Sequence, residues 1–200
     1  MKKTEKNILY WSNGQKKCEG NHKDGKYFLS NSWDKNGEIM VKDGNGVWTE
    51  WSDGQKYREK TYKDGEPDGL WTDWYVNGQK REERTYKDGK LDGKWTEWSE
   101  NGQKYREETY KDGELDGVKT EWYFSEMWTP EKKTLPKMRE ETYKYGKKNG
   151  VLAWWYSNGQ KGCEATYKNG ELDGLSTHWN YNGQKMSEVT YKDGELISEE

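Results

Sequence analysis

Polar and apolar residues alternate along most of this chain, in short runs that end at Asn-Gly or Asp-Gly. From Lys90, 11 alternating residues lead to Asn101-Gly102, and nine more lead to Asp112-Gly113. Alternation places successive side chains on opposite faces of a strand, and both dipeptides tolerate the positive φ of two-residue type I′ turns. The pattern therefore predicts one β-hairpin in every 24 residues, and consecutive hairpins would form an antiparallel meander.

Two landmarks give the period. The motif Asn-Gly-Gln-Lys begins at Asn77, Asn101, Asn158 and Asn182, and Thr-Tyr-Lys-x-Gly ends at glycines 65, 89, 113, 146, 170 and 194. The steps are 24 residues, except one of 33 that contains an insertion. Such repetition predicts one all-β domain over 1–200, an elongated single-layer twisted sheet. It has degenerate repeats in 1–47, regular repeats in 48–123 and 139–200, and an insertion loop at 124–138.

The turn fixes an expected register. A two-residue turn at Asn101-Gly102 would pair Trp98 with Tyr105, Glu97 with Arg106, and Trp95 with Glu108. One face would then carry Trp98, Thr96, Tyr105 and Thr109, and the other Trp95, Glu97, Arg106 and Tyr110. Tyr110 would cover Gly93, and the glycines that recur at 69, 93, 117, 150 and 174 mark expected bulges.

Two aromatic columns persist through the repeats. The slot before the Asn-Gly turn holds Trp33, Trp51, Trp74, Trp98, Trp122, Trp155 and Trp179. A second slot holds Tyr62, Tyr86, Tyr110, Tyr143, Tyr167 and Tyr191. Such constancy is typical of a structural ladder that packs the sheet.

A third column changes along the chain. It reads Trp48, Trp71 and Trp95, and then Lys119, Leu152 and Ser176. A half-exposed row of Trp48, Trp71 and Trp95 would suit a partner protein or a sugar, and plain packing is the alternative. The insertion adds Phe124, Met127 and Trp128, which form either a contact site or a tolerated surface loop.

Composition limits the kind of structure. Hydrophobic residues make up 29%, charged residues 36%, and mean hydropathy is −1.50. A deep core is therefore not expected, but 13 Trp and 15 Tyr provide rings that can order a thin sheet.

The charges are evenly mixed. A net charge of −3 arises from 34 basic and 37 acidic residues, which disfavours nucleic acid and membranes as partners. No apolar signal region or 18-residue apolar run occurs, so we expect a soluble cytoplasmic protein. Charged terminal segments would discourage edge pairing and favour a monomer.

The chemistry of catalysis is missing from the sequence. His22 and His178 lie in distant repeats, so no catalytic triad, metal site or cofactor site is expected, and we do not expect an enzyme. Cys18 and Cys163 are six repeats apart, about 60 Å in a meander, so free thiols and a reducing compartment are expected.

Residues 93–116, from Gly93-Lys94-Trp95-Thr96 through Asn-Gly-Gln-Lys and Thr-Tyr-Lys-Asp-Gly to Leu-Asp, resemble the MORN-repeat variant found in bacterial YwqK-type antitoxins. The resemblance extends over nearly the whole chain. It implies extended sheets of consecutive hairpins, a role in protein scaffolding, and a link to toxin-antitoxin systems.

The leading functional hypothesis is a non-enzymatic interaction scaffold, antitoxin-like or immunity-like. It would bind another protein, such as a toxin or effector, through an aromatic face. The alternative is a carbohydrate or cell-wall module, because the hairpins also resemble choline-binding cell-wall repeats. Binding to a membrane surface is the third hypothesis.

Overall fold

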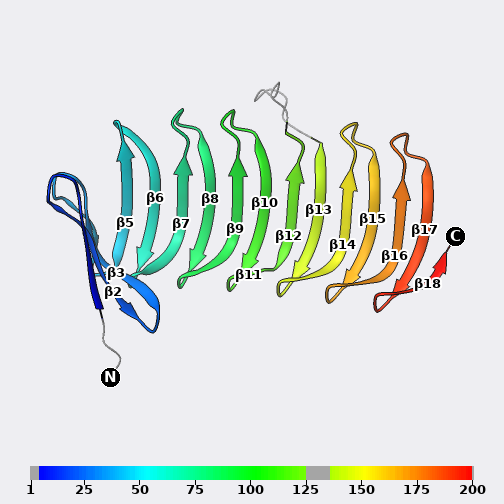
Figure 1. Ribbon diagram of the computed structural model, residues 1–200, viewed down its shortest axis with the longest axis horizontal. Helices are drawn as coiled ribbons and strands as arrows, with labels where there is room; N and C mark the ends of the chain where they lie inside the picture. Colours follow the sequence, from blue (N-terminus) through cyan, green and yellow to red (C-terminus); the bar gives the residue numbers. More distant parts are fainter. Residues whose placement is uncertain (1–4, 125–135, 200) are drawn as a thin grey trace. The chain divides into compact units, whose positions relative to one another are not determined.

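The computed structural model describes residues 5–124 and 136–199, and all regular elements in these ranges are β-strands (Figure 1). The chain forms two compact units, Met1–Asp92 and Gly93–Glu200. In both units consecutive strands pair antiparallel, so the predicted all-β meander of hairpins is confirmed.

The first unit contains eight complete strands and the start of a ninth. They are β1 (Glu5–Tyr10), β2 (Lys16–Lys23), β3 (Lys26–Trp33), β4 (Ile39–Lys42), β5 (Asn45–Ser52), β6 (Gln55–Lys63), β7 (Glu66–Trp74) and β8 (Lys80–Lys87). Strand β9 (Lys90–Trp98) begins in this unit and continues into the second.

The second unit continues the meander. Its further strands are β10 (Lys104–Lys111), β11 (Glu114–Leu115), β12 (Gly117–Trp122), β13 (Lys137–Lys144), β14 (Lys147–Trp155), β15 (Lys161–Lys168), β16 (Glu171–Trp179), β17 (Lys185–Lys192) and β18 (Glu195–Glu199). Residues 125–135, which include most of the predicted insertion loop, lie outside the described residues.

In repeats with an Asn-Gly turn the two turns differ, and the two-residue turn predicted at Asn101-Gly102 is wrong. Ser99 N donates to Gln103 O at 2.8 Å, and Gly102 N donates to Ser99 O at 2.8 Å, so three residues form the loop. Gly102 alone has a positive φ, 82°, and Asn101 Oδ1 accepts from Gln103 N at 3.1 Å. The Asn101 side chain therefore forms an Asx turn with Gln103 N. A type I′ turn would instead need a positive φ at Asn101.

The Asp-Gly turns follow the prediction. Asp112 and Gly113 both have positive φ, 51° and 93°, as a two-residue type I′ turn requires. Asp53-Gly54 belongs to this class as well, with φ of 51° and 80°. Its copy has two residues between Trp51 and Gly54, whereas the copies at Asn77, Asn101, Asn158 and Asn182 have three between the constant Trp and the glycine, so the shorter connection accompanies the two-residue turn.

The register shifts near the end of the hairpins, after turns of either length. Trp98 pairs with Lys104 and the ladder shifts before Arg106, so the predicted pairing of Trp98 with Tyr105 is wrong. Glu97 with Arg106 and Trp95 with Glu108 are paired as predicted. The same shift lies between Glu50 and Trp51, beside the two-residue turn of Asp53-Gly54. The bulge is therefore a feature of the strand pair, and the rest of the Asn101 strand keeps its predicted faces.

The Tyr column lies opposite glycines, as predicted. Tyr110 pairs with Gly93, and the same pairing recurs for Tyr62, Tyr86, Tyr143, Tyr167 and Tyr191 with glycines 46, 69, 117, 150 and 174. The pairing of β6 with β7 shifts register beside Gly69, which has a φ of 102°, so the predicted bulge is present there. A ring over the bare backbone compensates for the missing side chain.

The sheet therefore has two different faces. We call the face that carries the Tyr column, together with Trp71, Trp95 and Glu108, the Tyr face. The opposite face carries the constant Trp column and the Lys of each Asn-Gly-Gln-Lys motif, and we call it the Lys-Trp face.

On the Lys-Trp face, lysines join neighbouring hairpins. Lys104 Nζ lies 4.7 Å from the Trp122 ring centroid and 3.0 Å from Glu107 Oε2. Lys56 makes the same contacts with Trp74 and Glu59, at 4.5 and 2.9 Å. The constant Trp is thus a platform for the lysine of the preceding hairpin.

Candidate functional site

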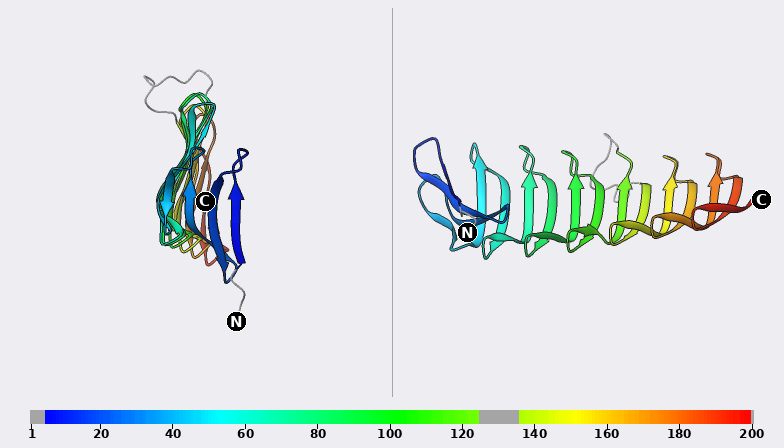
Figure 2. Two further views of the ribbon diagram at one scale, coloured as in Figure 1. Left: turned by 90° about the vertical axis from the view of Figure 1, so that its left-hand side faces the viewer. Right: turned by 60° about the horizontal axis from the view of Figure 1, so that its bottom comes forward.

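In the first unit the Tyr face is covered by the chain itself. Strands β2 and β3 fold back over β5 and β6 as a second layer, as the blue strands show in Figure 1 and in the left view of Figure 2. The buried cluster of Cys18, Leu29 and Val41 packs against Trp48 and Tyr62. The sequence predicted a single-layer sheet for this unit. The structure has two layers here, because the degenerate N-terminal strands cover the regular repeats and close a small core with them.

Polar contacts hold this covering hairpin in place. Leu29 N donates to Gly65 O at 2.9 Å, which joins β3 to the turn after β6. Lys17 Nζ lies 2.8 Å from Glu50 Oε1 and 4.6 Å from the Trp11 ring centroid. The Tyr face thus already binds one polypeptide segment, through small apolar side chains, backbone hydrogen bonds and an ion pair.

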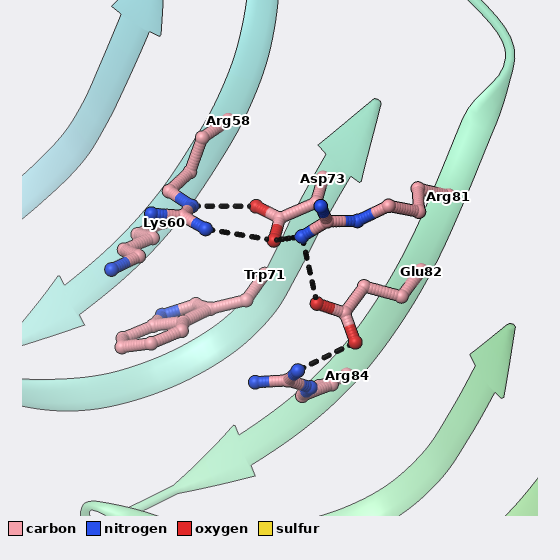
Figure 3. Close-up of a pocket in the computed structure, with 7 residues that line it drawn as sticks. All are labelled: Arg58, Lys60, Trp71, Asp73, Arg81, Glu82 and Arg84. Atoms are coloured by element: carbon pink, nitrogen blue, oxygen red, sulfur yellow. Dashed lines mark hydrogen bonds and ion pairs between the residues drawn. The ribbon is translucent and has the colours of Figure 1, made fainter. Parts of the chain in front are cut away.

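Beside the covered area, a cluster of charges surrounds Trp71 (Figure 3). The cluster consists of Arg58, Lys60, Asp73, Arg81, Glu82 and Arg84, and it encloses a cavity of about 230 Å³. Strands β6, β7 and β8 supply these side chains from adjacent positions on one face. We call this cavity the Trp71 pocket.

The two carboxylates of the Trp71 pocket are already engaged. Arg58 donates to Asp73 through Nε at 2.7 Å and Nη2 at 3.1 Å, and Arg81 Nη2 donates to the same carboxylate at 2.8 Å. Arg84 Nη2 donates to Glu82 at 2.5 Å. These hydrogen bonds lower the pKa of Asp73 despite its burial, which would raise it.

Trp71 itself is held between rings. Its centroid lies 5.6 Å from that of Tyr62 and 4.6 Å from that of Tyr86, and its Nε1 donates to Thr61 O at 3.0 Å. Lys60 Nζ lies 4.5 Å from the Trp71 centroid. The two tyrosines thus fix the indole on one side, and the cations of the Trp71 pocket lie beside it.

In the second unit the Tyr face begins as a charged grid. Arg106 lies 3.3 Å from Glu97 Oε2 and 2.6 Å from Glu108 Oε1, and Tyr110 Oη donates to Glu108 Oε2 at 2.7 Å. Glu108 is only 1% exposed. Burial alone would raise its pKa, but the hydrogen bonds from Tyr110 and Arg106 lower it overall, and the same carboxylate raises the pKa of Tyr110.

On β14 and β15 the same face becomes more apolar, although Arg139, Ser176 and His178 also line the groove that forms there. Leu152, Trp154, Cys163 and Ala165 replace the charged residues of the earlier repeats, and the last two are 5% and 4% exposed. With Met138, Tyr167 and Leu172 they line an open groove of about 600 Å³. We call this the apolar groove.

A glycine shapes the floor of the apolar groove. A Cβ added at Gly162 would lie 2.0 Å from Trp154 Cζ3, so the indole rests directly on the backbone of β15. Trp154 also packs edge-on against Tyr156, with centroids 4.9 Å apart. The position of Trp154 is therefore set by the missing side chain of its neighbour.

Both cysteines are free and buried, as expected. Burial raises the pKa of the Cys18 and Cys163 thiols, so both remain protonated near neutral pH. Cys163 therefore contributes a small apolar surface to the groove and not a nucleophile.

The predicted contact residues occupy different surroundings. Trp48 packs against the N-terminal core, Trp71 lines its pocket, and Trp95 lies 6.1 Å from Tyr110 and 5.5 Å from the Arg106 guanidinium. Phe124 is 59% exposed at the start of the insertion, and Met127 and Trp128 lie outside the described residues. The stripe expected from Trp48, Trp71 and Trp95 is therefore not one uniform exposed surface.

Sequence reasoning missed the arginines around Trp71 and the whole apolar groove. A signal was available for both. The columns beside the Trp column read Glu50, Asp73, Glu97, Glu121 and then Trp154, and Lys60, Arg84, Glu108, Glu141 and then Ala165. The same comparison that revealed the Trp stripe would have shown the change from charged to apolar residues.

Two kinds of feature are absent from the described residues. Residues 5–124 and 136–199 contain no group of three or more His, Cys, Asp or Glu side chains placed to hold a metal ion. This part of the chain also has no helix long and apolar enough to span a bilayer.

Comparison with known proteins identifies the repeat. Residues 67–88, 91–112 and 172–193 match the family model described as MORN repeat variant. The solved structure titled "Crystal Structure of TcdB2-TccC3-Cdc42" aligns with 95% of this chain at 10% identity and a TM-score of 0.24. The alignment spans 12% of that much longer chain. No curated protein matches.

Proposed function

This chain carries MORN-variant repeats, which are generally interaction modules, and we propose that it is a non-enzymatic scaffold that binds a partner protein on its Tyr face. The supporting observation is the chain's own β2–β3 hairpin, which covers this face in the first unit. Cys18 and Leu29 are 2% and 1% exposed there. A face that packs one polypeptide segment has the chemistry to pack another.

The apolar groove of the second unit is the proposed binding surface. Trp154, which is half-buried, and Met138, which is 36% exposed, offer apolar surface at this groove beside the buried Leu152 and Ala165, as Trp48 and Tyr62 do beneath the β2–β3 hairpin. The proposed occupant is an extended segment of the partner with small apolar side chains facing the sheet. A rigid Trp such as Trp154 loses little rotamer entropy on binding and is typical of interface hot spots.

Capture from the native host tests the proposal. The tagged protein should retain one stoichiometric partner, and Trp154→Ala should lose it. Val151→Ala is the matched control, because Val151 lies on the same strand, 45% exposed on the opposite face, and it should keep the partner. A photo-crosslinker at Met138 should attach to that same partner.

The proposal fails if the host supplies no stoichiometric partner. It also fails if Trp154→Ala still binds the partner and has the native circular dichroism spectrum. Within this proposal the partner is a toxin, as the family resemblance implies. Co-expression with the neighbouring gene should then restore growth that the neighbour alone arrests, and Trp154→Ala should abolish the rescue.

A further inference from the structure

The Trp71 pocket carries more positive charge than its own carboxylates neutralise. Four cations, Arg58, Lys60, Arg81 and Arg84, share the cavity with the two carboxylates of Asp73 and Glu82. Glu50 is 3.9 Å from Arg58 Nη1 but 2.8 Å from Lys17, and it does not line the cavity. The side chains that line this half-enclosed space therefore carry four positive and two negative charges.

Lys60 is the cation that the protein leaves without a carboxylate. Among the described residues no carboxylate oxygen lies within ion-pair distance of its Nζ, although most lysines on this sheet have such a contact. Its ammonium rests against the Trp71 ring at 4.5 Å. Burial lowers its pKa, and the neighbouring Arg58 adds to that effect.

We propose that the Trp71 pocket is a binding site for a carboxylate anion, which would complete the ion pairing of Lys60 and rest its methylene carbons on Trp71. Arg58 already binds the Asp73 carboxylate in fork geometry, and Arg84 donates one hydrogen bond to Glu82, so the pocket is built from groups that bind carboxylates. The indole offers an apolar surface to an aliphatic stem. A volume of about 230 Å³ accommodates one acidic side chain or a small free dicarboxylate.

Carboxylate binding would act on Lys60 in a defined way. An added anion favours the charged amine, so the pKa of Lys60 should rise toward its usual value when the site is filled. Binding should weaken with added salt, because both partners are charged and the pocket is open to solvent. Neither expectation involves the apolar groove, so this site can fail while the partner proposal stands.

Nuclear magnetic resonance of the full chain provides the test. The reporter is the indole N–H of Trp71, which is assigned with Trp71→Phe. The probes are an N-acetylated, C-amidated tri-glutamate peptide, its tri-glutamine counterpart, glutarate and inorganic phosphate. Tri-glutamate should shift the Trp71 indole signal, and tri-glutamine should not.

Variants then identify the site. Lys60→Met keeps the aliphatic stem and should weaken tri-glutamate binding by about fivefold or more, whereas Lys60→Arg should largely retain it. Lys56→Met removes a lysine from the same strand on the opposite face and should change affinity by less than about twofold. Native amide spectra establish that the variants fold. If Lys60→Met does not fold, Lys60→Arg is used to test the site.

The outcomes are distinct. Glutarate that binds as well as the peptide would support the site with a free carboxylate as its ligand, and a clear preference for tri-glutamate would support an acidic protein segment. The proposal is overturned if tri-glutamate does not shift the Trp71 indole signal. It is also overturned if Lys60→Met and Lys56→Met bind tri-glutamate with equal affinity. Phosphate that binds as tightly as tri-glutamate overturns the assignment to carboxylates.

Discussion

Lys17 and Glu50 form an ion pair at 2.8 Å that joins the covering hairpin to the sheet of the first unit. The Glu50 side chain is 10% exposed and that of Lys17 is 24% exposed. Both groups have lost much of their water, so removal of one leaves the other poorly solvated.

Lys17→Met should therefore destabilise the protein by roughly 1–2 kcal/mol, a value discounted for the partial exposure of the lysine. The measurement is urea unfolding at neutral pH. Lys16→Met, which removes an exposed lysine paired with Glu19, is the control and should cost less than about 0.5 kcal/mol. Equal losses for the two variants would show that the Lys17 pair does not hold the hairpin.

Gly162 is the second test, because the Trp154 ring occupies the space where a side chain would begin. Gly162→Ala should cost about 1–3 kcal/mol through overpacking and should change the near-ultraviolet circular dichroism of the tryptophans. The smaller ring of Trp154→Phe should relieve the clash, so the double variant should be more stable than the sum of the single effects predicts. Additive losses would contradict the contact.

Glu108 should contribute a pH-dependent part of the stability. Its pKa is lowered in the folded protein, so its stabilising effect is complete above the ordinary Glu value of about 4.5 and is lost as pH falls through the lower folded value. Glu108→Gln should destabilise the protein by about 1–3 kcal/mol at pH 7, because Arg106 and Tyr110 lose their ionised acceptor.

The comparison of unfolding at pH 7 and pH 3 checks this prediction. The gap between wild type and Glu108→Gln should narrow at pH 3, because below the ordinary Glu pKa of about 4.5 the unfolded state takes up a proton that the folded state disfavours. Glu114→Gln, an exposed change on the neighbouring β11, should show no such convergence. A gap that is constant with pH would mean that Glu108 acts through its shape and not its charge.

The shorter connection at Asp53-Gly54 predicts that one residue can be deleted from the Asn101-Gly102 turn. Removal of Glu100 together with Asn101→Asp reproduces the shorter sequence Ser-Asp-Gly-Gln of residues 52–55. The hairpin should adopt a two-residue turn, keep Trp98 opposite Lys104, and lose less than about 1 kcal/mol of stability. Removal of Glu100 alone leaves Asn in place and serves as the comparison. Loss of the Trp98 to Lys104 pairing in amide spectra would contradict this prediction.

The repeat made the fold predictable. Asp-Gly turns and the pairing of Tyr110 with Gly93 depend only on local backbone preferences and on the period of two, and the structure has both. The loop at Asn101 was not predictable from the same rule, because one additional residue lies before the glycine. The bulge beyond it was not predictable either, because it follows turns of both lengths. The Asn101 side chain stabilises that loop through a hydrogen bond of its own.

The sequence by itself therefore determined the hairpin unit, the face on which each regular residue lies, and the pairing along most of each strand. Those properties follow from alternation and turn chemistry within 24 residues. Only the tertiary structure decided that Trp48 is covered by Leu29 and its neighbours, that four cations converge on Trp71, and that Leu152 to Ala165 form a groove. These depend on how strands curl and on which side chains meet across strands, and no local pattern encodes that geometry.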